Sequence, residues 1–268
     1  MKYITSIITM IFVVCFLSLG NVAVAQEQKS QEDSIFNSAK SSKDWNVMVG
    51  YKGWFSKWQT FALYNFSEQS GVVSSVSETV YTHIPVLGFR YKKFFISASY
   101  MKTYFRFPNL SNMERKEGDI SLTYYINRYF GITAGYKMLH INQKISFYNQ
   151  DFNLKQKLEG PTIGFMGSIP IGKKGFGLYS AFSYGRLESN FYFNGDEAIY
   201  TDDEKLPYYV GELGLSYSPR IQKHVKFLNS ANVYAGYRFQ NLYMKNLVEG
   251  GDGKYSTDGF VVGFNLSF

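Results

Sequence analysis

The last nine residues of the chain alternate strictly between large apolar side chains and small, polar or modest ones. The first set is Phe260, Val262, Phe264, Leu266 and Phe268, and the residues between them are Val261, Gly263, Asn265 and Ser267. Alternation with a period of two predicts a β-strand with one strongly apolar face. Because terminal residues fray unless they are tied down, a pattern that includes the last residue indicates a strand held in a larger sheet.

The same alternation recurs along most of the chain. Phe94, Ile96 and Ala98, for example, alternate with Ser97 and Ser99. Counting such segments predicts ten strands, near 44–56, 85–92, 94–107, 117–126, 129–145, 156–171, 176–191, 207–218, 229–244 and 257–268. Only the strand at 176–191 has ambiguous faces, because two sets compete for its apolar face: Leu178, Phe182 and Tyr184 against Tyr179, Ala181 and Leu187.

The connections between these strands alternate in character. Those near 93, 128 and 173 are tight, and 219–228 is somewhat longer. The others are expected to be mostly long, polar loops, at 57–84, 108–116, 146–155, 192–206 and 245–256. Short turns on one side and long loops on the other are typical of an up-and-down barrel, in which the last strand pairs with the first.

The N-terminus has the order of a secretory signal peptide. Lys2 precedes an apolar run, and Ala23 and Ala25 precede Gln26, so we expect cleavage after Ala25. A retained signal anchor is the alternative. Cleavage removes Cys15, the single cysteine, so the exported part relies on packing and hydrogen bonds without disulfides. Residues 26–43 are polar and aperiodic, which predicts a flexible periplasmic segment.

The composition limits the class of protein further. No later segment offers the ~18 consecutive apolar residues of a membrane helix. The mean hydropathy of −0.20 suits a soluble protein, but it also suits a membrane β-barrel, in which only alternate residues face lipid. The net charge of +7 is carried by scattered residues, so we expect no nucleic-acid partner.

With its signal peptide, alternating strands and terminal "FNLSF", the chain resembles the small outer-membrane β-barrel proteins of Gram-negative bacteria. The resemblance covers residues 44–268 and implies one all-β domain, a closed antiparallel transmembrane barrel of eight to twelve strands. It also implies that Phe264, Leu266 and Phe268 form an assembly signal read by the outer-membrane assembly machinery. A secreted soluble β-sandwich is the alternative fold, but it would expose polar residues on one face of each sheet.

In a barrel, charges on the face opposite the apolar one point into the lumen. These are Lys52, Arg90, Asp119, Lys137, Glu212 and Arg238. Charges in a narrow interior must pair or be hydrated, and we predict that Glu212 pairs with Arg238 on the neighbouring strand. Two interpretations stay open: a polar plug that fixes strand register, and a narrow passive channel for small solutes that slightly favours anions.

A membrane-embedded enzyme, either a lipid-modifying enzyme or a protease, is a further hypothesis. His140 is predicted near the outer rim, with Asp119, Glu117 and Ser146 as possible partners for general-base chemistry. No family motif of such enzymes surrounds these residues. His83 and His224 complete the histidines, and no cofactor or metal ion is expected.

Two surface features point to the lipid environment. Trp45, Trp54 and Trp58 are predicted to form aromatic girdles at the two membrane interfaces. Seven basic residues near the predicted outer rim could contact lipopolysaccharide phosphates: Lys102, Arg106, Arg115, Lys116, Lys144, Lys155 and Lys157. The sequence thus favours a structural or interaction role, with loops displayed outside the membrane and lipopolysaccharide as a partner.

Overall fold

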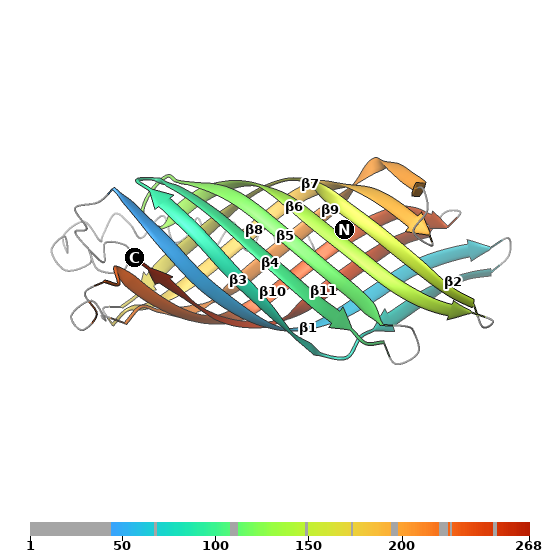
Figure 1. The fold of residues 1–268 in the computed structure, drawn as a ribbon, viewed down its shortest axis with the longest axis horizontal. Coiled ribbons are helices and arrows are strands. Elements are labelled where there is room, and N and C mark those ends of the chain that lie inside the picture. The colour runs from blue at the N-terminus through green and yellow to red at the C-terminus, as the bar shows by residue number, and fades with distance from the viewer. Residues whose placement is uncertain are drawn as a thin grey trace. The chain divides into compact units, whose positions relative to one another are not determined.

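A computed structural model describes residues 44–66, 69–107, 112–147, 150–172, 174–193, 198–219, 225, 227–248 and 251–268. The predicted signal peptide (1–25) and N-terminal segment (26–43) lie outside these residues. No helix in the described part of the chain is long and apolar enough to cross a membrane. The described residues form a single all-β domain (Figure 1).

The domain is an antiparallel barrel with ten strand positions. Its elements are β1 (Trp45–Phe66), β2 (Gln69–Val76), β3 (Val80–Tyr91), β4 (Phe94–Phe105), β5 (Met113–Tyr125), β6 (Phe130–Phe147), β7 (Gln150–Ile171), β8 (Phe176–Phe193), β9 (Ala198–Tyr217), β10 (Ser230–Val248) and β11 (Gly251–Ser267). Both β2 and β3 pair with β1, one after the other along its length. They therefore share one position, interrupted at 77–79, which accounts for ten positions from eleven elements.

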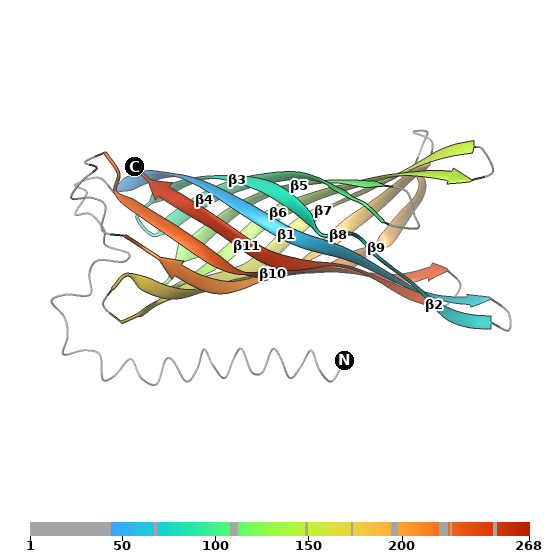
Figure 2. The same cartoon turned by 90° about the horizontal axis from the view of Figure 1, so that it is seen from below.

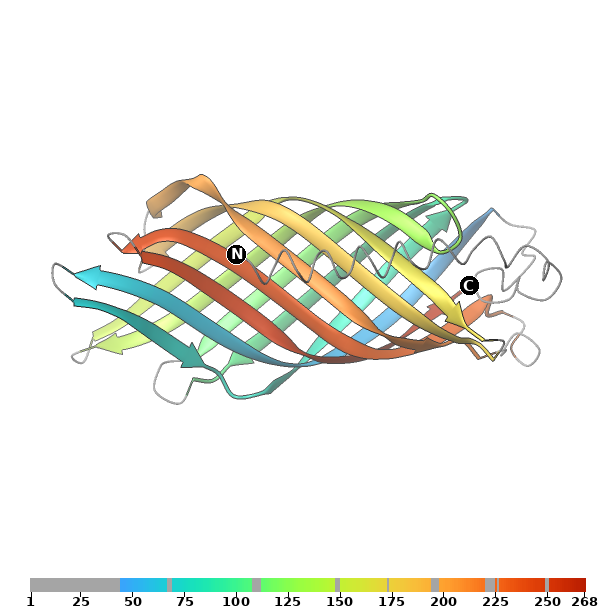
Figure 3. The ribbon, with the colours of Figure 1, turned by 180° about the vertical axis from the view of Figure 1, so that it is seen from behind.

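The barrel closes through β1 and β11, which pair from Met48 opposite Ser267 to Ala62 opposite Gly253. Phe268 extends this pairing, because its amide donates a hydrogen bond of 2.9 Å to the carbonyl of Val47. Closure joins the two ends of the sheet, and so satisfies backbone groups that an open edge would leave unpaired. The closed barrel predicted from the sequence is confirmed (Figures 1 and 3).

One end of the barrel, here called the turn end, carries Asp44, Phe268 and the short connections. The turn at 92–93 places Lys92 at φ 52°, and the turn at 172–175 uses Gly172 at φ 66° and Gly175 at φ 86°. Positive φ angles cost little at glycine, so those two residues permit the tight reversal. Figure 2 shows the C-terminus at this end, beside the start of β1.

The opposite end, the hairpin end, differs from the sequence prediction. Long polar loops were expected there, but the strands continue into them: β1 and β7 each have 22 residues, and β9 has 20. Polar residues in these stretches alternate with apolar ones, so the strands remain paired well beyond the predicted boundaries (Figure 2). Only two to seven residues separate consecutive strands at this end, and much of the predicted loop sequence is barrel wall.

The outer surface of the barrel near the turn end carries a continuous apolar belt. Leu87, Ile163 and Phe260, for instance, expose 61–69% of their surface. Other members are Val47, Val49, Phe89, Ile96, Ile120, Leu122, Ile132, Ile169, Leu213, Leu215, Val233, Val262 and Phe264. We call this part of the barrel the belt half.

Beyond the belt, towards the hairpin end, the inner face of the barrel wall is apolar and the outer face is charged. The interior holds an apolar core of Trp58, Phe105, Phe107, Met113, Leu139, Ile141, Leu158, Leu187, Leu206, Tyr208, Leu242 and Met244. The exterior carries exposed charged residues such as Lys57, Lys155 and Arg186. We call this part the distal half.

This exchange of faces is visible within single strands. On β4, Phe94 and Ile96 point outward and are exposed, whereas Met101 and Phe105 point inward and are buried. On β8, Phe176 is exposed and Leu187 is completely buried, so the even-numbered positions face outward. The ambiguity in this strand is thereby resolved in favour of Leu178, Phe182 and Tyr184 on the outer face.

Candidate functional site

A cluster of charged side chains crosses the lumen where the two halves meet. Its centre is the buried carboxylate of Glu117 on β5. Arg115 donates to it at 2.7 Å and Gln240 at 2.9 Å, and Lys137 on β6 also donates to it. Residues two apart on one strand share a face, which places Arg115 and Glu117 together inside the barrel.

A second carboxylate, Glu212 on β9, extends the cluster across the lumen. Lys52 on β1 approaches it at 3.0 Å, and Arg238 on β10 donates to it at 3.1 Å. The predicted pair of Glu212 and Arg238 is therefore present, with Lys52 as a third member. Arg238 also lies 3.7 Å from Glu117, which joins the two carboxylates into one network.

Two more predicted lumen charges take different positions. Asp119 accepts a hydrogen bond of 3.0 Å from Lys137, at the edge of the cluster. Arg90 lies elsewhere, near the turn end, where it donates to the carbonyl of Lys92 and its guanidinium stacks over Tyr125. The cluster therefore unites Lys52, Asp119, Lys137, Glu212 and Arg238. Sequence reasoning missed Arg115 as an inward charge, and it considered Glu117 only as a partner of His140.

Two tryptophans pack against the cluster, which corrects the girdle prediction for both. Trp54 and Trp58 are 0% and 1% exposed, inside the lumen. Arg238 stacks over the ring of Trp54 and Arg115 over that of Trp58, at 5.3 and 5.1 Å. Rings enclosed in this way cannot reach lipid. Trp45 faces outward, 44% exposed and stacked on Phe89, as an interface residue would be.

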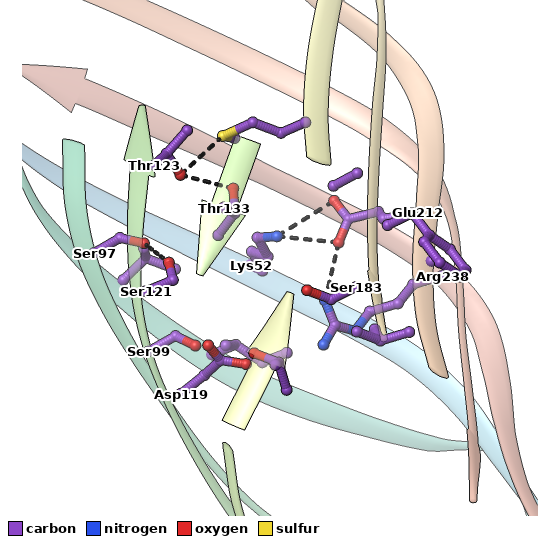
Figure 4. Close-up of a pocket in the computed structure, with 18 of the residues that line it drawn as sticks. Lys52, Ser97, Ser99, Asp119, Ser121, Thr123, Thr133, Ser183, Glu212 and Arg238 are labelled. Atoms are coloured by element: carbon purple, nitrogen blue, oxygen red, sulfur yellow. Dashed lines mark hydrogen bonds and ion pairs between the residues drawn. The ribbon is translucent and has the colours of Figure 1, made fainter. Parts of the chain in front are cut away.

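On the turn-end side of the cluster lies a cavity of about 190 Å³. Hydroxyl groups of serines and threonines line much of it, and many of them pair with one another: Ser97 with Ser121 at 2.8 Å, and Thr123 with Thr133 at 2.9 Å. The charged residues of its lining are Lys52, Glu117, Asp119, Glu212 and Arg238 (Figure 4). A cavity of this character can hold water and small polar solutes.

On the hairpin-end side of the cluster the lumen is filled. Trp58, Leu158, Leu187 and Tyr208 are 0–1% exposed and belong to one packed core. Trp58 meets Phe105 edge to face at 5.1 Å. The charged cluster and this core are both buried inside the described barrel, and the larger cavity lies on their turn-end side.

The residues proposed for catalysis are not brought together. His140 on β6 is exposed on the outside of the wall, whereas Asp119 on the neighbouring strand points inward to Lys137. Adjacent positions on a strand face opposite sides, so neither Asp119 nor Glu117 can reach His140. The side chain of Ser146 and all of His224 lie outside the described residues. His83 contacts Tyr51 and Tyr81 on the outer face.

Four of the exterior basic and histidine residues form a row across four adjacent strands. Lys102 on β4 stands directly opposite Lys116 on β5, Lys116 opposite His140, and His140 opposite Lys157 on β7. Glu114 bridges the first two lysines, at 2.8 Å from Lys102 and 3.3 Å from Lys116. We call Lys102, Lys116, His140 and Lys157 the basic row. It borders the apolar belt at the start of the distal half.

The other basic residues predicted at the rim divide between the two faces. Arg106, Lys144 and Lys155 are exposed in the distal half, as expected for the rim. Arg115 is a correction: it is buried in the lumen, where it bonds Glu117 and Thr257 and cannot contact lipid headgroups. Its position follows from the alternation of side chains along β5. Lys116 faces outward opposite Lys102, so the adjacent residue Arg115 faces inward.

The C-terminal residues are accessible on the belt. Phe264 is 40% exposed and stacks on Tyr51 at 6.0 Å, and Phe268 stacks on Phe227 at 6.2 Å. Leu266 stands opposite Val49 of β1. Phe264 and Leu266 of the predicted assembly signal thus lie on β11, the strand that closes the barrel, and Phe268 directly follows it.

The sequence matches no known protein family and no curated protein. Among solved structures, the outer-membrane protease OmpT from Escherichia coli has the same fold, with a TM-score of 0.59 and 12% identity over 83% of this chain and 97% of that one. The translocator domain of the autotransporter NalP from Neisseria meningitidis also matches, with a TM-score of 0.45 and 11% identity over 94% of this chain and 98% of that domain. At this identity the likeness to OmpT shows a shared β-barrel fold and nothing further.

Proposed function

We propose that the chain is an integral β-barrel of the bacterial outer membrane with a structural and interaction role. The belt half spans the membrane, and the distal half projects outside it as a sealed barrel. The observation that carries this proposal is the packed interior of the described barrel beside an outer apolar belt. A barrel with an apolar exterior and a packed interior is suited to anchoring in a membrane and to displaying its distal end.

The length of the strands supports the projection. The 22 residues of β1, at about 3.3 Å each and a tilt of about 40°, rise by about 55 Å. An outer-membrane barrel needs an apolar band of only about 25 Å. Roughly half of the barrel therefore extends beyond the lipid, which agrees with its charged exterior and apolar core.

The basic row supports lipopolysaccharide as a partner. It follows the border of the belt, where lipid phosphates would lie, and lysine ammonium groups donate charge-assisted hydrogen bonds to phosphate. Export through a cleaved signal peptide and recognition of Phe268 by the assembly machinery complete the proposal.

The passive channel is a second candidate, which the cavity of about 190 Å³ favours. It requires the charged cluster and the distal core to open together. The enzyme hypothesis has less support, since His140 and Asp119 face opposite sides of the wall. The likeness to OmpT concerns the fold and adds no catalytic group to this chain.

Planar-bilayer conductance of the purified protein tests the sealed lumen. The proposal predicts no discrete conductance steps for the wild type. Steps that change in an Arg238→Ala/Glu212→Ala variant would establish the channel instead, with these charges along its path.

Binding to lipopolysaccharide vesicles tests the basic row. Near an anionic surface each lysine contributes about 1 kcal/mol, so Lys102→Gln, Lys116→Gln and Lys157→Gln together should weaken binding by about two orders of magnitude. The control variant removes three cations at the turn end: Lys92→Gln, Lys93→Gln and Arg128→Gln. Equal losses in both variants would show a dependence on net charge alone and would contradict a specific row.

A further inference from the structure

The charged cluster has one more cation than it has carboxylates. Its cations are Lys52, Arg115, Lys137 and Arg238, and its carboxylates are Glu117, Asp119 and Glu212. An uncompensated charge is costly inside a protein, where little water is present to solvate it. One additional monovalent anion would balance the described cluster.

A second, smaller cavity lies beside the cluster, within the distal core. Its volume is about 10 Å³, and Trp58, Arg115, Tyr208 and Leu139 are among the residues that line it. A cavity of that volume has room for about one water-sized particle.

Three buried side-chain groups of this lining have no hydrogen-bond partner in the described part of the chain. They are the indole Nε1 of Trp58, the Nε of Arg115 and the hydroxyl of Tyr208. Each terminal nitrogen of Arg115 has at least one partner among Thr257, Glu117 and Gln240, so Nε is the guanidinium nitrogen that has none in the described residues. All three groups carry hydrogen, and two of them can only donate.

The chemistry of these donors distinguishes an anion from water. A water molecule accepts about two hydrogen bonds and has two hydrogens of its own to donate, and of these three groups only the Tyr208 hydroxyl can also accept a hydrogen bond. A monatomic anion accepts all three hydrogen bonds and needs no acceptor. It would also supply the missing negative charge beside the Arg115 guanidinium.

We propose that this cavity binds a single halide ion, with Trp58, Arg115 and Tyr208 as its ligands. The ion joins the charged cluster to the apolar core and completes the charge balance of the lumen. The proposal is independent of the role in the membrane and of lipopolysaccharide binding, because it rests on side chains inside the barrel and on none of its outer surface.

Anomalous diffraction tests the proposal directly. The protein is refolded and crystallised in sodium bromide, so that the ion is present when the barrel closes. The expected result is an anomalous bromide peak within reach of Trp58 Nε1, Arg115 Nε and the Tyr208 hydroxyl. A peak without anomalous signal, as a water would give, or no peak at all would overturn the proposal.

A solution measurement adds matched variants. The melting temperature of the wild type should rise in bromide or chloride relative to gluconate, an anion too large for the cavity, at equal ionic strength. Trp58→Phe and Tyr208→Phe each remove one donor and keep most of the volume, so halide affinity should fall about tenfold in each. The control Tyr104→Phe loses a hydroxyl outside the barrel and should keep the full shift. A wild-type melting temperature that is identical in all three salts would overturn the proposal.

Discussion

The belt half and the distal half use the same strands and the same alternation, but with the faces reversed. In the belt half, Leu213 and Leu215 face outward, and the lumen carries hydroxyls and charges. In the distal half, Leu158 and Leu187 face inward, and the outer face carries lysines and arginines. The backbone geometry is the same in both halves. The position of the apolar residues therefore depends on the surroundings of each face, and the β-strand conformation does not determine it.

The charged cluster lies between the belt half and the distal half. A substitution in it should change the free energy of unfolding more than any other substitution considered below. Glu117→Ala leaves Lys137 and Arg115 without their buried counter-charge, and should lower the free energy of unfolding by about 3–5 kcal/mol. Urea unfolding in detergent micelles, followed by tryptophan fluorescence, measures this loss. The control Glu188→Ala removes an exposed carboxylate that pairs with Lys205, and should cost about 0–1 kcal/mol. Similar losses in the two variants would show that the cluster is not a buried network.

The distal core should respond like the core of a soluble protein. Leu187→Ala leaves a cavity among fully buried neighbours, and should cost about 2–5 kcal/mol of unfolding free energy. Truncating an exposed side chain on the outside of the same half, Lys155→Ala, should change it by at most about 0.5 kcal/mol. If Leu187→Ala is as mild as Lys155→Ala under the same urea titration, the core is loosely packed and the lumen is not sealed.

The outer surfaces of the two halves can be compared at equal exposure. Leu213 in the belt half and Tyr104 in the distal half are 56% and 55% exposed. Leu213→Arg places a charge in lipid and should cost about 2–4 kcal/mol in phospholipid bilayers, whereas Tyr104→Arg faces water and should cost less than about 1 kcal/mol. Equal costs would mean that the two surfaces meet the same solvent.

The smallest expected effect concerns the basic row and its dependence on pH. Hydrogen bonding to the Lys102 ammonium lowers the pKa of Glu114, which lies outside the belt. A carboxyl whose pKa is lowered by folding contributes stability above its ordinary value of 4.5, and that stability is lost as the pH falls through the lowered pKa. Since the Lys102 side chain is 42% exposed, the melting temperature should fall only slightly below pH 4.5. Lys102→Gln should reduce this fall, while Lys116 still lowers the pKa of Glu114 to a smaller extent. A larger acid effect in Lys102→Gln than in the wild type would contradict the assignment.

Much of the belt half follows from the sequence, because an apolar outer face and a polar lumen give a clear alternation. Phe94, Ile96 and their neighbours were assigned to the outer face, and the pairing of the last strand with the first follows from the pattern that ends at Phe268. The pairing of Glu212 and Arg238 could be predicted from their matching positions on neighbouring strands.

The distal half was harder to predict because its strands resemble loops. Residues such as Lys155 and Lys157 suggest solvent, and only their alternation with Gln156 and Leu158 reveals a strand. The tryptophans were misplaced for a related reason, since an amphipathic ring suits both a membrane interface and a polar lumen. The alternation along β1 indicates the correct face. Trp54 and Trp58 lie on the same face of β1 as Lys52, and Val49 lies on the opposite face.

The reversal of faces along one strand tests the central claim most directly. Cleavage of the predicted signal peptide removes Cys15, so a single engineered cysteine can carry a nitroxide label at each outward position of β6. Paramagnetic accessibility in bilayers is measured with oxygen, which partitions into lipid, and with a nickel chelate, which stays in water. We predict oxygen accessibility at Ile132, Ala134 and Tyr136, then nickel accessibility at His140 and Lys144. Oxygen accessibility that persists to Lys144 would mean that lipid surrounds the whole strand, and would contradict a projecting half.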